Sequence, residues 1–183
     1  GAGATDDPAV QFSTGTATSR TVAFTIPSNS TAVVFQSKVT LLTGTIAGTV
    51  VMTADVPGAT GLLAGQIAVN PTIPQVMTIN AVRVAPNLRV QITGYSPERR
   101  MVSADFGFDI KTPSGTQRVP LSRAVDGDFD TWYRDPASVP FGSSFFYEQL
   151  FTVQGNVSNV DAVTVTLTNG EGKTTSAVVP FTN

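Results

Sequence analysis

The stretch VSADFGFDIK, residues 102–111, alternates apolar and polar side chains with a period of two. In an extended chain successive side chains point to opposite faces, so each set shares one face. The apolar face carries Val102, Ala104, Phe106, Phe108 and Ile110, and the polar face carries Ser103, Asp105, Asp109 and Lys111. This pattern predicts an antiparallel strand with one face in a core and the other in water.

The same alternation recurs along the chain, in segments rich in the β-branched residues that favour strands. The predicted apolar faces are Val22, Phe24 and Ile26 in residues 20–27; Ile46, Val50, Met52 and Ala54 in residues 43–56; Leu88, Val90 and Ile92 in residues 87–95; and Val163, Val165 and Leu167 in residues 161–169. No window of a dozen residues shows an amphipathic helical stripe. The pair Asn169–Gly170 predicts a tight hairpin turn that joins residues 161–168 to 173–182.

The composition excludes several classes of function. Charged residues make up only 13% of the 183 residues and the net charge is −2, so there is no basic stripe for nucleic acid and no polybasic membrane patch. The chain has no Cys and no His, which removes disulfides, thiolate nucleophiles, Ser-His-Asp triads and His-ligated metals. No segment reaches the roughly 18 apolar residues of a membrane span. We therefore expect a chain that is not an enzyme, has no cofactor and does not insert into membranes.

A domain boundary is predicted at NPTIPQ, residues 70–75, because two prolines stiffen an extended connector. The predicted fold class is all-β: two tandem antiparallel β-sandwiches, residues 1–73 and 74–183, the second immunoglobulin-like or fibronectin type III-like. The first is short, which is explained either by a lost N-terminal strand or by a small sandwich that leans on its neighbour. The opening GAGATDD lacks the regions of a signal peptide, and we expect flanking domains of a longer secreted chain.

Several stretches together resemble modules of large secreted or cell-surface bacterial proteins built from tandem β-sandwiches. VQFSTGTATSRTVAFTIPSNSTAVVFQ and LLTGTIAGTVVMTADV resemble an early module, and VQITGYSPERRMVSADFGF, DTWY and FTVQGNVSNVDAVTVTLTN resemble the immunoglobulin-like module that follows it. The resemblance implies an extracellular bacterial setting and a role in spacing, display or adhesion. It brings no catalytic residues with it.

The stretch DGDFDTWYRD, residues 126–135, offers two interpretations. Asp126, Asp128 and Asp130 have the 1-3-5 spacing of a calcium loop, but the sixth position is Thr131 where Gly is needed, and the twelfth is Ala137 where Glu is needed. The preferred interpretation is a turn at Asp126–Gly127 that leads into a strand, and the calcium site remains the alternative.

The aromatic residues also have two interpretations. Trp132, Tyr133, Phe145, Phe146 and Tyr147 could stack on sugar rings, with Trp132 and Tyr133 as the candidate ligand residues. A sandwich core normally absorbs two or three large aromatics, so core packing is preferred.

The remaining charged candidates are interpreted as solvated loops. Glu98, Glu148 and Glu171 lie too far apart in sequence to be placed as a glycosidase pair. Glu98, Arg99 and Arg100 in SPERRM are predicted to form a solubilising hairpin tip. The sequence thus favours a non-catalytic structural, adhesion or spacer module on the bacterial surface or in secreted form, whose partner is an unknown surface protein or polysaccharide. The alternative is a carbohydrate-binding module, with or without calcium.

Overall fold

A computed structural model describes residues 6–183, and residues 1–5 of the GAGATDD stretch lie outside the described residues. Strands make up 54% of the chain and helices 10%, in several antiparallel sheets, so the all-β class is confirmed. The chain divides into two compact units, Gly1–Asn70 (unit 1) and Pro71–Asn183 (unit 2). That they are the independently folding domains 1–73 and 74–183 stays a prediction.

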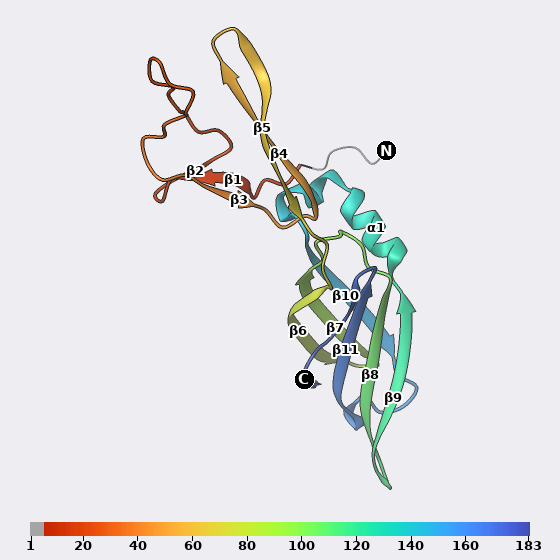
Figure 1. Ribbon diagram of the computed structural model, residues 1–183. Helices are drawn as coiled ribbons and strands as arrows, with labels where there is room; N and C mark the ends of the chain where they lie inside the picture. Colours follow the sequence, from red (N-terminus) through yellow and green to blue (C-terminus); the bar gives the residue numbers. More distant parts are fainter. Residues whose placement is uncertain (1–5) are drawn as a thin grey trace. The chain divides into compact units, whose positions relative to one another are not determined.

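Unit 2 contains two antiparallel sheets, one in the order β10-β7-β6 and one in the order β12-β11-β8-β9, with β13 also paired to β11. Their strands are β6 Gln75–Val84, β7 Asn87–Tyr95, β8 Ser103–Thr112, β9 Gly115–Ala124, β10 Ser144–Thr152, β11 Val160–Asn169, β12 Gly172–Thr175 and β13 Val179–Pro180. In Figure 1, β11, β8 and β9 run side by side in front of β6, β7 and β10.

The two sheets of unit 2 enclose one core. The predicted apolar faces of β7 and β11 are confirmed, since their side chains are at most 2% exposed: Leu88, Val90, Ile92, Val163, Val165 and Leu167. Phe151 of β10 packs edge-on against Phe106 and Phe108 of β8, with ring centroids 4.8 and 5.0 Å apart. Val102 departs from the prediction, because it precedes β8 and is 41% exposed.

The chain of unit 2 crosses between its sheets three times. It passes from β7 to β8 through residues 96–102, and returns from β9 to β10 through helix α1, Asp126–Arg134, and the 3₁₀ helix η1, Pro136–Phe141. A second 3₁₀ helix, η2, Val157–Asn159, precedes β11. If the strands of unit 2 are numbered along the chain from β6 as strand one, the sheet of β6, β7 and β10 has the order 1-2-5. The sheet of β9, β8, β11 and β12 then has the order 4-3-6-7, in which strands six and seven form the β11–β12 hairpin.

The hairpin between β11 and β12 is present, but its turn differs from the prediction. Asn169 pairs with Gly172, so the two turn residues are Gly170 and Glu171. Neither Asn169 nor Gly170 has a positive φ, whereas Gly172 has φ +138°. The Asn169 side chain instead accepts a hydrogen bond from the Glu171 N–H at 3.0 Å, so it stabilises the turn from its first corner.

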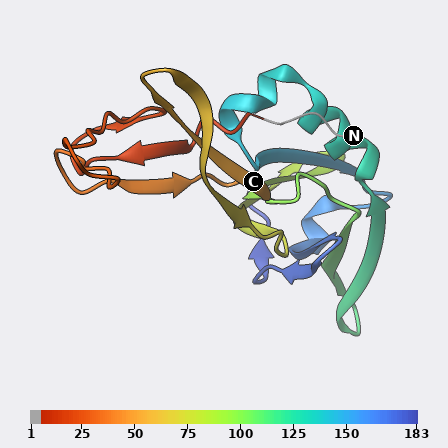
Figure 2. The same ribbon diagram turned by 45° about the horizontal axis from the view of Figure 1, so that its top comes forward.

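Unit 1 contains a small sheet in the order β2-β1-β3 and a separate hairpin, β4–β5 (Figure 2). The elements are β1 Val10–Ser13, β2 Thr18–Ser19, β3 Thr40–Thr43, β4 Gly48–Val56 and β5 Ala59–Val69. The predicted strand at residues 20–27 is wrong, because that segment forms only an isolated bridge between Thr25 and Val34. Within β4 the predicted alternation is present: Val50, Met52 and Ala54 are half-buried.

Unit 1 has no buried apolar side chain among its described residues, 6–70. Its one buried residue is Asp7, which is 6% exposed. The Asp7 carboxylate accepts hydrogen bonds from the N–H groups of Ala9, Thr45 and Ile46 at 2.7–3.0 Å. A polar anchor thus fixes the turn before β4, and no apolar core supports it.

Within residues 6–183, no helix is both long enough and apolar enough to cross a membrane.

Candidate functional site

Residues 126–134 form α1, so the predicted turn and strand at DGDFDTWYRD are wrong. The helix is encoded locally. Asp126 and Asp128 lie in its first turn and Arg134 in its last, where their charges complement the helix dipole. Phe129 and Tyr133 are four residues apart, so they share one face, and both are buried. Residues four apart share one face in a strand as well as in a helix, so Phe129 and Tyr133 point inward in either element. The spacing of these two residues therefore did not distinguish a strand from a helix.

α1 ends where its sequence dictates. Asp135 is extended (φ −68°, ψ 128°), as expected for a residue that precedes proline. The Asp135 carboxylate accepts a hydrogen bond from the Ala137 N–H at 2.8 Å and so caps η1. Helix and 3₁₀ helix together form a bracket that leads the chain from β9 to β10 (Figure 1).

The helix is fixed to β10 by aromatic contacts. Phe129 packs against Phe145 and Tyr147, with centroids 5.0 and 5.6 Å apart. The Tyr133 hydroxyl donates a hydrogen bond to the Ser143 carbonyl at 2.7 Å. Core packing is therefore confirmed for Tyr133, Phe145 and Tyr147, whereas Phe146 points outward and is 60% exposed.

Trp132 occupies a different position from Tyr133. It is half-buried, and its indole N–H donates a hydrogen bond to the Ser144 carbonyl at 3.3 Å. Its ring lies 5.8 Å from that of Phe141, which is 57% exposed. The two sequence candidates thus separate: Tyr133 belongs to the core, and Trp132 forms a partly exposed aromatic pair with Phe141.

The SPERRM segment is not a hairpin tip but the crossing from β7 to β8. Arg99 adopts φ +52°, and its guanidinium donates hydrogen bonds to the Tyr133 carbonyl and, at 2.8 Å, to the Ser138 hydroxyl. The same group lies 5.1 Å from the centroid of the Tyr133 ring. Glu98 accepts a hydrogen bond from the Gly170 N–H at 3.0 Å. Of the three charged residues in this segment only Arg100 is exposed, so the predicted solubilising role is wrong for Glu98 and Arg99.

The three candidate calcium ligands lie on α1 and not in a loop. Asp126, Asp128 and Asp130 are all exposed. On a helix Asp128 points about 200° away from Asp126, so the three carboxylates do not converge. Asp130 instead forms an ion pair with Arg134 at 2.9 Å. In the part of the chain that the structure describes, no three His, Cys, Asp or Glu side chains are grouped as metal ligands.

The three glutamates that could supply a glycosidase pair are Glu98, Glu148 and Glu171, and each has a defined position in unit 2. Glu148 lies on the exposed side of β10 and accepts a hydrogen bond from Gln91 at 2.7 Å. Glu171 is exposed in the turn of the β11–β12 hairpin, and Glu98 contacts the neighbouring Gly170. Glu98 and Glu148 each hold a structural hydrogen bond.

Burial affects the two tyrosines in this region. It raises the pKa of Tyr133 well above its usual value, and the nearby Arg99 guanidinium opposes this only partly. Burial also raises the pKa of Tyr147, against the opposing effect of Arg123, while Asp128 raises it further. Both phenols therefore remain protonated at neutral pH and act as hydrogen-bond donors.

One surface of unit 2 that could contact a ligand is the pair Trp132 and Phe141. A separate pocket of about 380 Å³ opens beside Leu88, Phe108 and Phe151. Phe141 was missed in the sequence, where it lies outside the DGDFDTWYRD stretch. In the sequence, Phe141 directly follows Pro140 and is the only aromatic residue of the segment PASVPF, which forms η1. The planes of the two rings are tilted by 45°, so one ring can stack on a flat apolar face, such as that of a pyranose ring, while the other contacts its edge.

Comparison of the chain with family models, with curated proteins and with solved structures finds no match.

Proposed function

We propose that the chain is a non-catalytic structural module, with a spacer or adhesion role, of a secreted or cell-surface bacterial protein. Unit 2 is then an immunoglobulin-like or fibronectin type III-like β-sandwich. Its strand orders 1-2-5 and 4-3-6-7 support this, since seven antiparallel strands, β13 left aside, divide between two sheets with crossings of the same kind. The fourth strand, β9, pairs with β8 and not with β10, so the arrangement differs from the ABED and CFG sheets of a constant-type immunoglobulin domain.

The observation that carries the spacer role is the direction of the chain through unit 2. β6 starts at Gln75, and Thr182 forms a parallel bridge with Val82 of the same strand. Seven residues of strand span about 23 Å. Because β6 and the last segment run in the same direction, the chain enters unit 2 at one end and leaves at the other. A module of this kind extends a tandem array along one line.

The surface chemistry supports an extracellular setting. The chain has no Cys whose thiol an oxidising medium could modify, and Thr-rich strand faces keep the surface polar with few charges. The partners that follow are flanking domains of the same longer chain and an unknown surface protein or polysaccharide.

The spacer role is tested by the rigidity of unit 2. Since the chain lacks Cys, Met77→Cys and Thr182→Cys introduce two unique labelling sites, one near each end, and both residues are exposed. Electron–electron double resonance between spin labels should give one narrow distance distribution that persists under mild denaturant. A broad distance distribution in the native protein would contradict the role of a rigid spacer. A second pair, Met77→Cys with Leu150→Cys, controls for label mobility.

Carbohydrate binding is the second candidate, and the Trp132–Phe141 pair favours it. We expect a glycan array to show binding that Trp132→Ala and Phe141→Ala both abolish. Phe146→Ala is the matched control, because Phe146 is equally exposed and has no ring contact with Trp132 among the described residues. Binding that survives both substitutions would exclude this pair as the site. A calcium-dependent change in binding would test the calcium-assisted form.

A further inference from the structure

Unit 1 carries its charges near its start: Asp6, Asp7 and Arg20 precede a long stretch, residues 21–70, that is almost free of charge. The chain has 11 Lys and Arg and 13 Asp and Glu, yet only Lys38 and Asp55 lie in residues 21–70. These two charges have opposite signs and cancel. A surface of this composition has neither the repulsion nor the hydration that keeps most protein surfaces apart.

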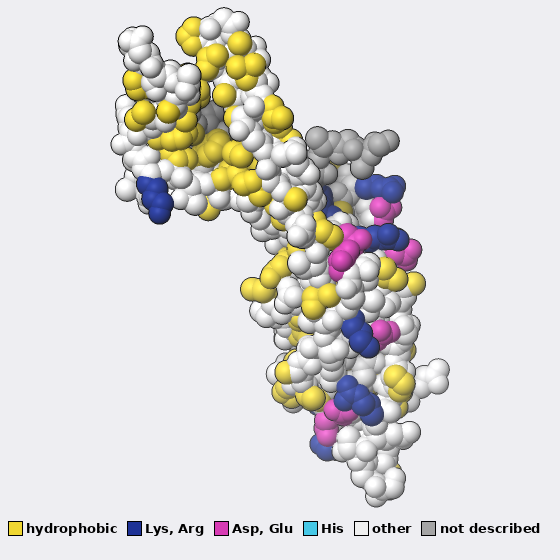
Figure 3. Space-filling view, viewed as in Figure 1, with side chains coloured by type: hydrophobic (Ala, Val, Ile, Leu, Met, Phe, Trp, Pro, Cys, Tyr) yellow, Lys and Arg dark blue, Asp and Glu magenta, His cyan; other side chains and the backbone are white. Residues whose placement is uncertain are grey.

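The β4–β5 hairpin exposes apolar side chains on both of its faces. One face carries Val50 and Ala54 of β4 opposite Ile67 and Leu62 of β5. The other face carries the polar residues Thr49, Thr53, Asp55 and Gln66 together with the two most exposed apolar side chains of the hairpin, Val51 at 57% and Leu63 at 68%. A strand face in water normally carries polar side chains, so the exposed Val51 and Leu63 are the residues that a partner would cover. Figure 3 shows hydrophobic side chains gathered over this part of unit 1.

The outer edge of β5 is also unguarded, whereas β4 carries Asp55. In the described part of the chain β4 and β5 pair only with each other. β5 is the longest strand, at 11 residues, and contains neither a charge nor a proline. The edge strands of unit 2 do carry such residues: Arg118, Pro120 and Arg123 on β9, Glu148 on β10, Arg83 on β6 and Lys173 on β12. Charges and prolines at an edge prevent pairing with another chain, so the contrast marks β5 as an edge that can pair.

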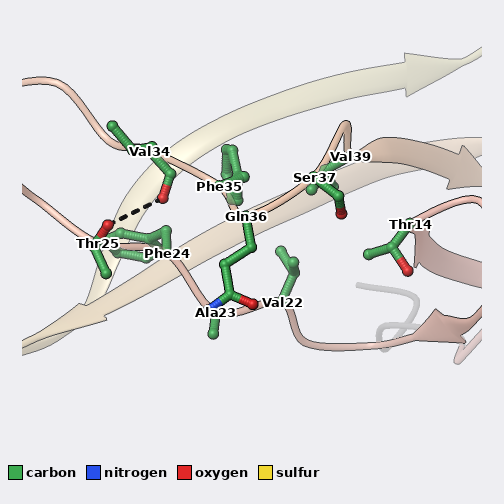
Figure 4. Close-up of a pocket in the computed structure, with 10 residues that line it drawn as sticks. All are labelled: Thr14, Val22, Ala23, Phe24, Thr25, Val34, Phe35, Gln36, Ser37 and Val39. Atoms are coloured by element: carbon green, nitrogen blue, oxygen red, sulfur yellow. Dashed lines mark hydrogen bonds between the residues drawn. The ribbon is translucent and has the colours of Figure 1, made fainter.

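An apolar pocket of about 160 Å³ lies in the same unit. Phe24 and Phe35 meet edge to face in its wall, with centroids 6.3 Å apart, and the rest of its apolar lining is Val22, Ala23, Val34 and Val39 (Figure 4). Val34 and Phe35 are 49% and 39% exposed, so the pocket is open to water. Its volume is large enough for one aliphatic side chain of a partner.

We propose that the β4–β5 hairpin is a self-association surface, on which a second copy of this chain docks its own hairpin about a two-fold axis. Nine large apolar side chains of unit 1 are 39–68% exposed and together leave on the order of 700 Å² in water, against the roughly 800 Å² that each partner gives to a standard interface. Val51, Leu62, Leu63 and Ile67 of the hairpin supply about half of this area.

A second copy fits this surface better than a charged partner does. Antiparallel pairing of one edge with the same edge of a copy is two-fold symmetric, so β5 can pair with itself. An uncharged strand places no like charges opposite each other when it does so. The second hairpin also supplies apolar side chains for the open face of the first.

The test is the mass of the full chain in solution, measured by light scattering and sedimentation over a range of concentrations. We expect a dimer, and at least a tenfold weaker dimer for Leu63→Lys and for Ile67→Lys. Leu150→Lys is the matched control, since Leu150 is a 52% exposed leucine on an edge strand of unit 2, and it should leave the dimer unchanged. Backbone amides of β5 should be protected from exchange in the dimer and lose protection in the lysine variants.

Val51→Lys provides a second variant on the face of Leu63, opposite to the face of Ile67, and far-ultraviolet circular dichroism verifies that each variant keeps its strands. A wild-type chain that stays monomeric up to about 100 μM would overturn the proposal. So would a dimer that the hairpin variants leave intact, or one that Leu150→Lys weakens equally. Open-ended polymers in place of a dimer would exclude the two-fold arrangement.

Discussion

Arg83 and Phe181 are joined twice: the Arg83 guanidinium donates a hydrogen bond to the Phe181 carbonyl at 2.7 Å and lies 5.9 Å from the centroid of the Phe181 ring. The same guanidinium donates to the Val160 carbonyl at 2.8 Å. One side chain on β6 therefore holds both the start of β11 and the last segment of the chain. Phe181 itself is buried and stacks on Phe108.

Replacing Arg83 by alanine should destabilise unit 2 by about 2 kcal/mol, since two half-buried carbonyls lose a charged donor. Urea unfolding, followed by the fluorescence of the single tryptophan, Trp132, measures the free energy of unfolding. Arg134→Ala is the control, because its ion pair with Asp130 is largely exposed and should contribute at most about 0.5 kcal/mol. Equal losses in the two variants would contradict the anchoring role of Arg83.

Arg99→Met should loosen the α1–η1 bracket and lower the free energy of unfolding by about 2–3 kcal/mol. Methionine keeps the apolar stem but donates no hydrogen bond to the Tyr133 carbonyl or the Ser138 hydroxyl. Amide exchange in residues 132–141 should rise more than exchange in β7 and β11. The exposed neighbour Arg100, replaced by methionine in the same way, should leave both measurements almost unchanged. Unchanged exchange in the bracket of Arg99→Met would show that packing alone holds it.

Two glycines of unit 2 should respond in opposite ways to alanine. At Gly94 a Cβ atom would overlap the Gln75 carbonyl and lie 2.8 Å from a ring carbon of Phe145, so Gly94→Ala should cost about 2–3 kcal/mol. At Gly127, on α1, a Cβ atom meets nothing within 4 Å. Gly127→Ala should stabilise the protein by about 0.5–1 kcal/mol, because alanine favours helix. Thermal unfolding of the two variants gives the signs directly, and a stabilised Gly94→Ala would refute the close approach of β6, β7 and β10.

Strands β7, β8 and β11 of unit 2 were predictable because period-two alternation reflects a local property of an extended chain with one buried face. Phe106 and Phe108 of β8 and Val163 and Val165 of β11 follow it closely. Pairing and sheet order were not predictable, since they depend on which distant segments meet. The single residue Val102 shows the limit at a strand end, since the alternation begins one residue before β8 and the Val102 side chain is exposed.

The helix α1 was missed because it is only nine residues long, too short for a search over a dozen residues. Its apolar side chains Phe129, Trp132 and Tyr133 have the spacing i, i+3, i+4, and Pro136 marks its end. In unit 1 the alternation of Val22, Phe24 and Ile26 gave a wrong strand. A strand is stable only with a hydrogen-bonded neighbour, and residues 20–27 have just one bridge.

Alkaline pH should destabilise unit 2 through its buried tyrosines. Unfolded tyrosine ionises near pH 10, whereas burial raises the pKa of Tyr133 and of Tyr147 in the folded state. The stabilising contribution of each phenol is therefore fully present below about pH 10, and it is lost as the pH rises from there through the folded-state pKa. The free energy of unfolding should fall above pH 10 by up to about 1.4 kcal/mol per pH unit for each tyrosine.

Tyr133→Phe isolates this effect. At neutral pH the variant should be about 1 kcal/mol less stable, because the Ser143 carbonyl loses the hydrogen bond from the phenol. Above pH 10 its stability should fall less steeply than that of the wild type, since one ionisable group has been removed. Urea unfolding at a series of pH values gives the slopes, and tyrosinate absorbance reports the ionisation itself. Parallel slopes for wild type and Tyr133→Phe would mean that Tyr133 ionises equally in the folded and unfolded chain, and that its burial has no consequence for stability.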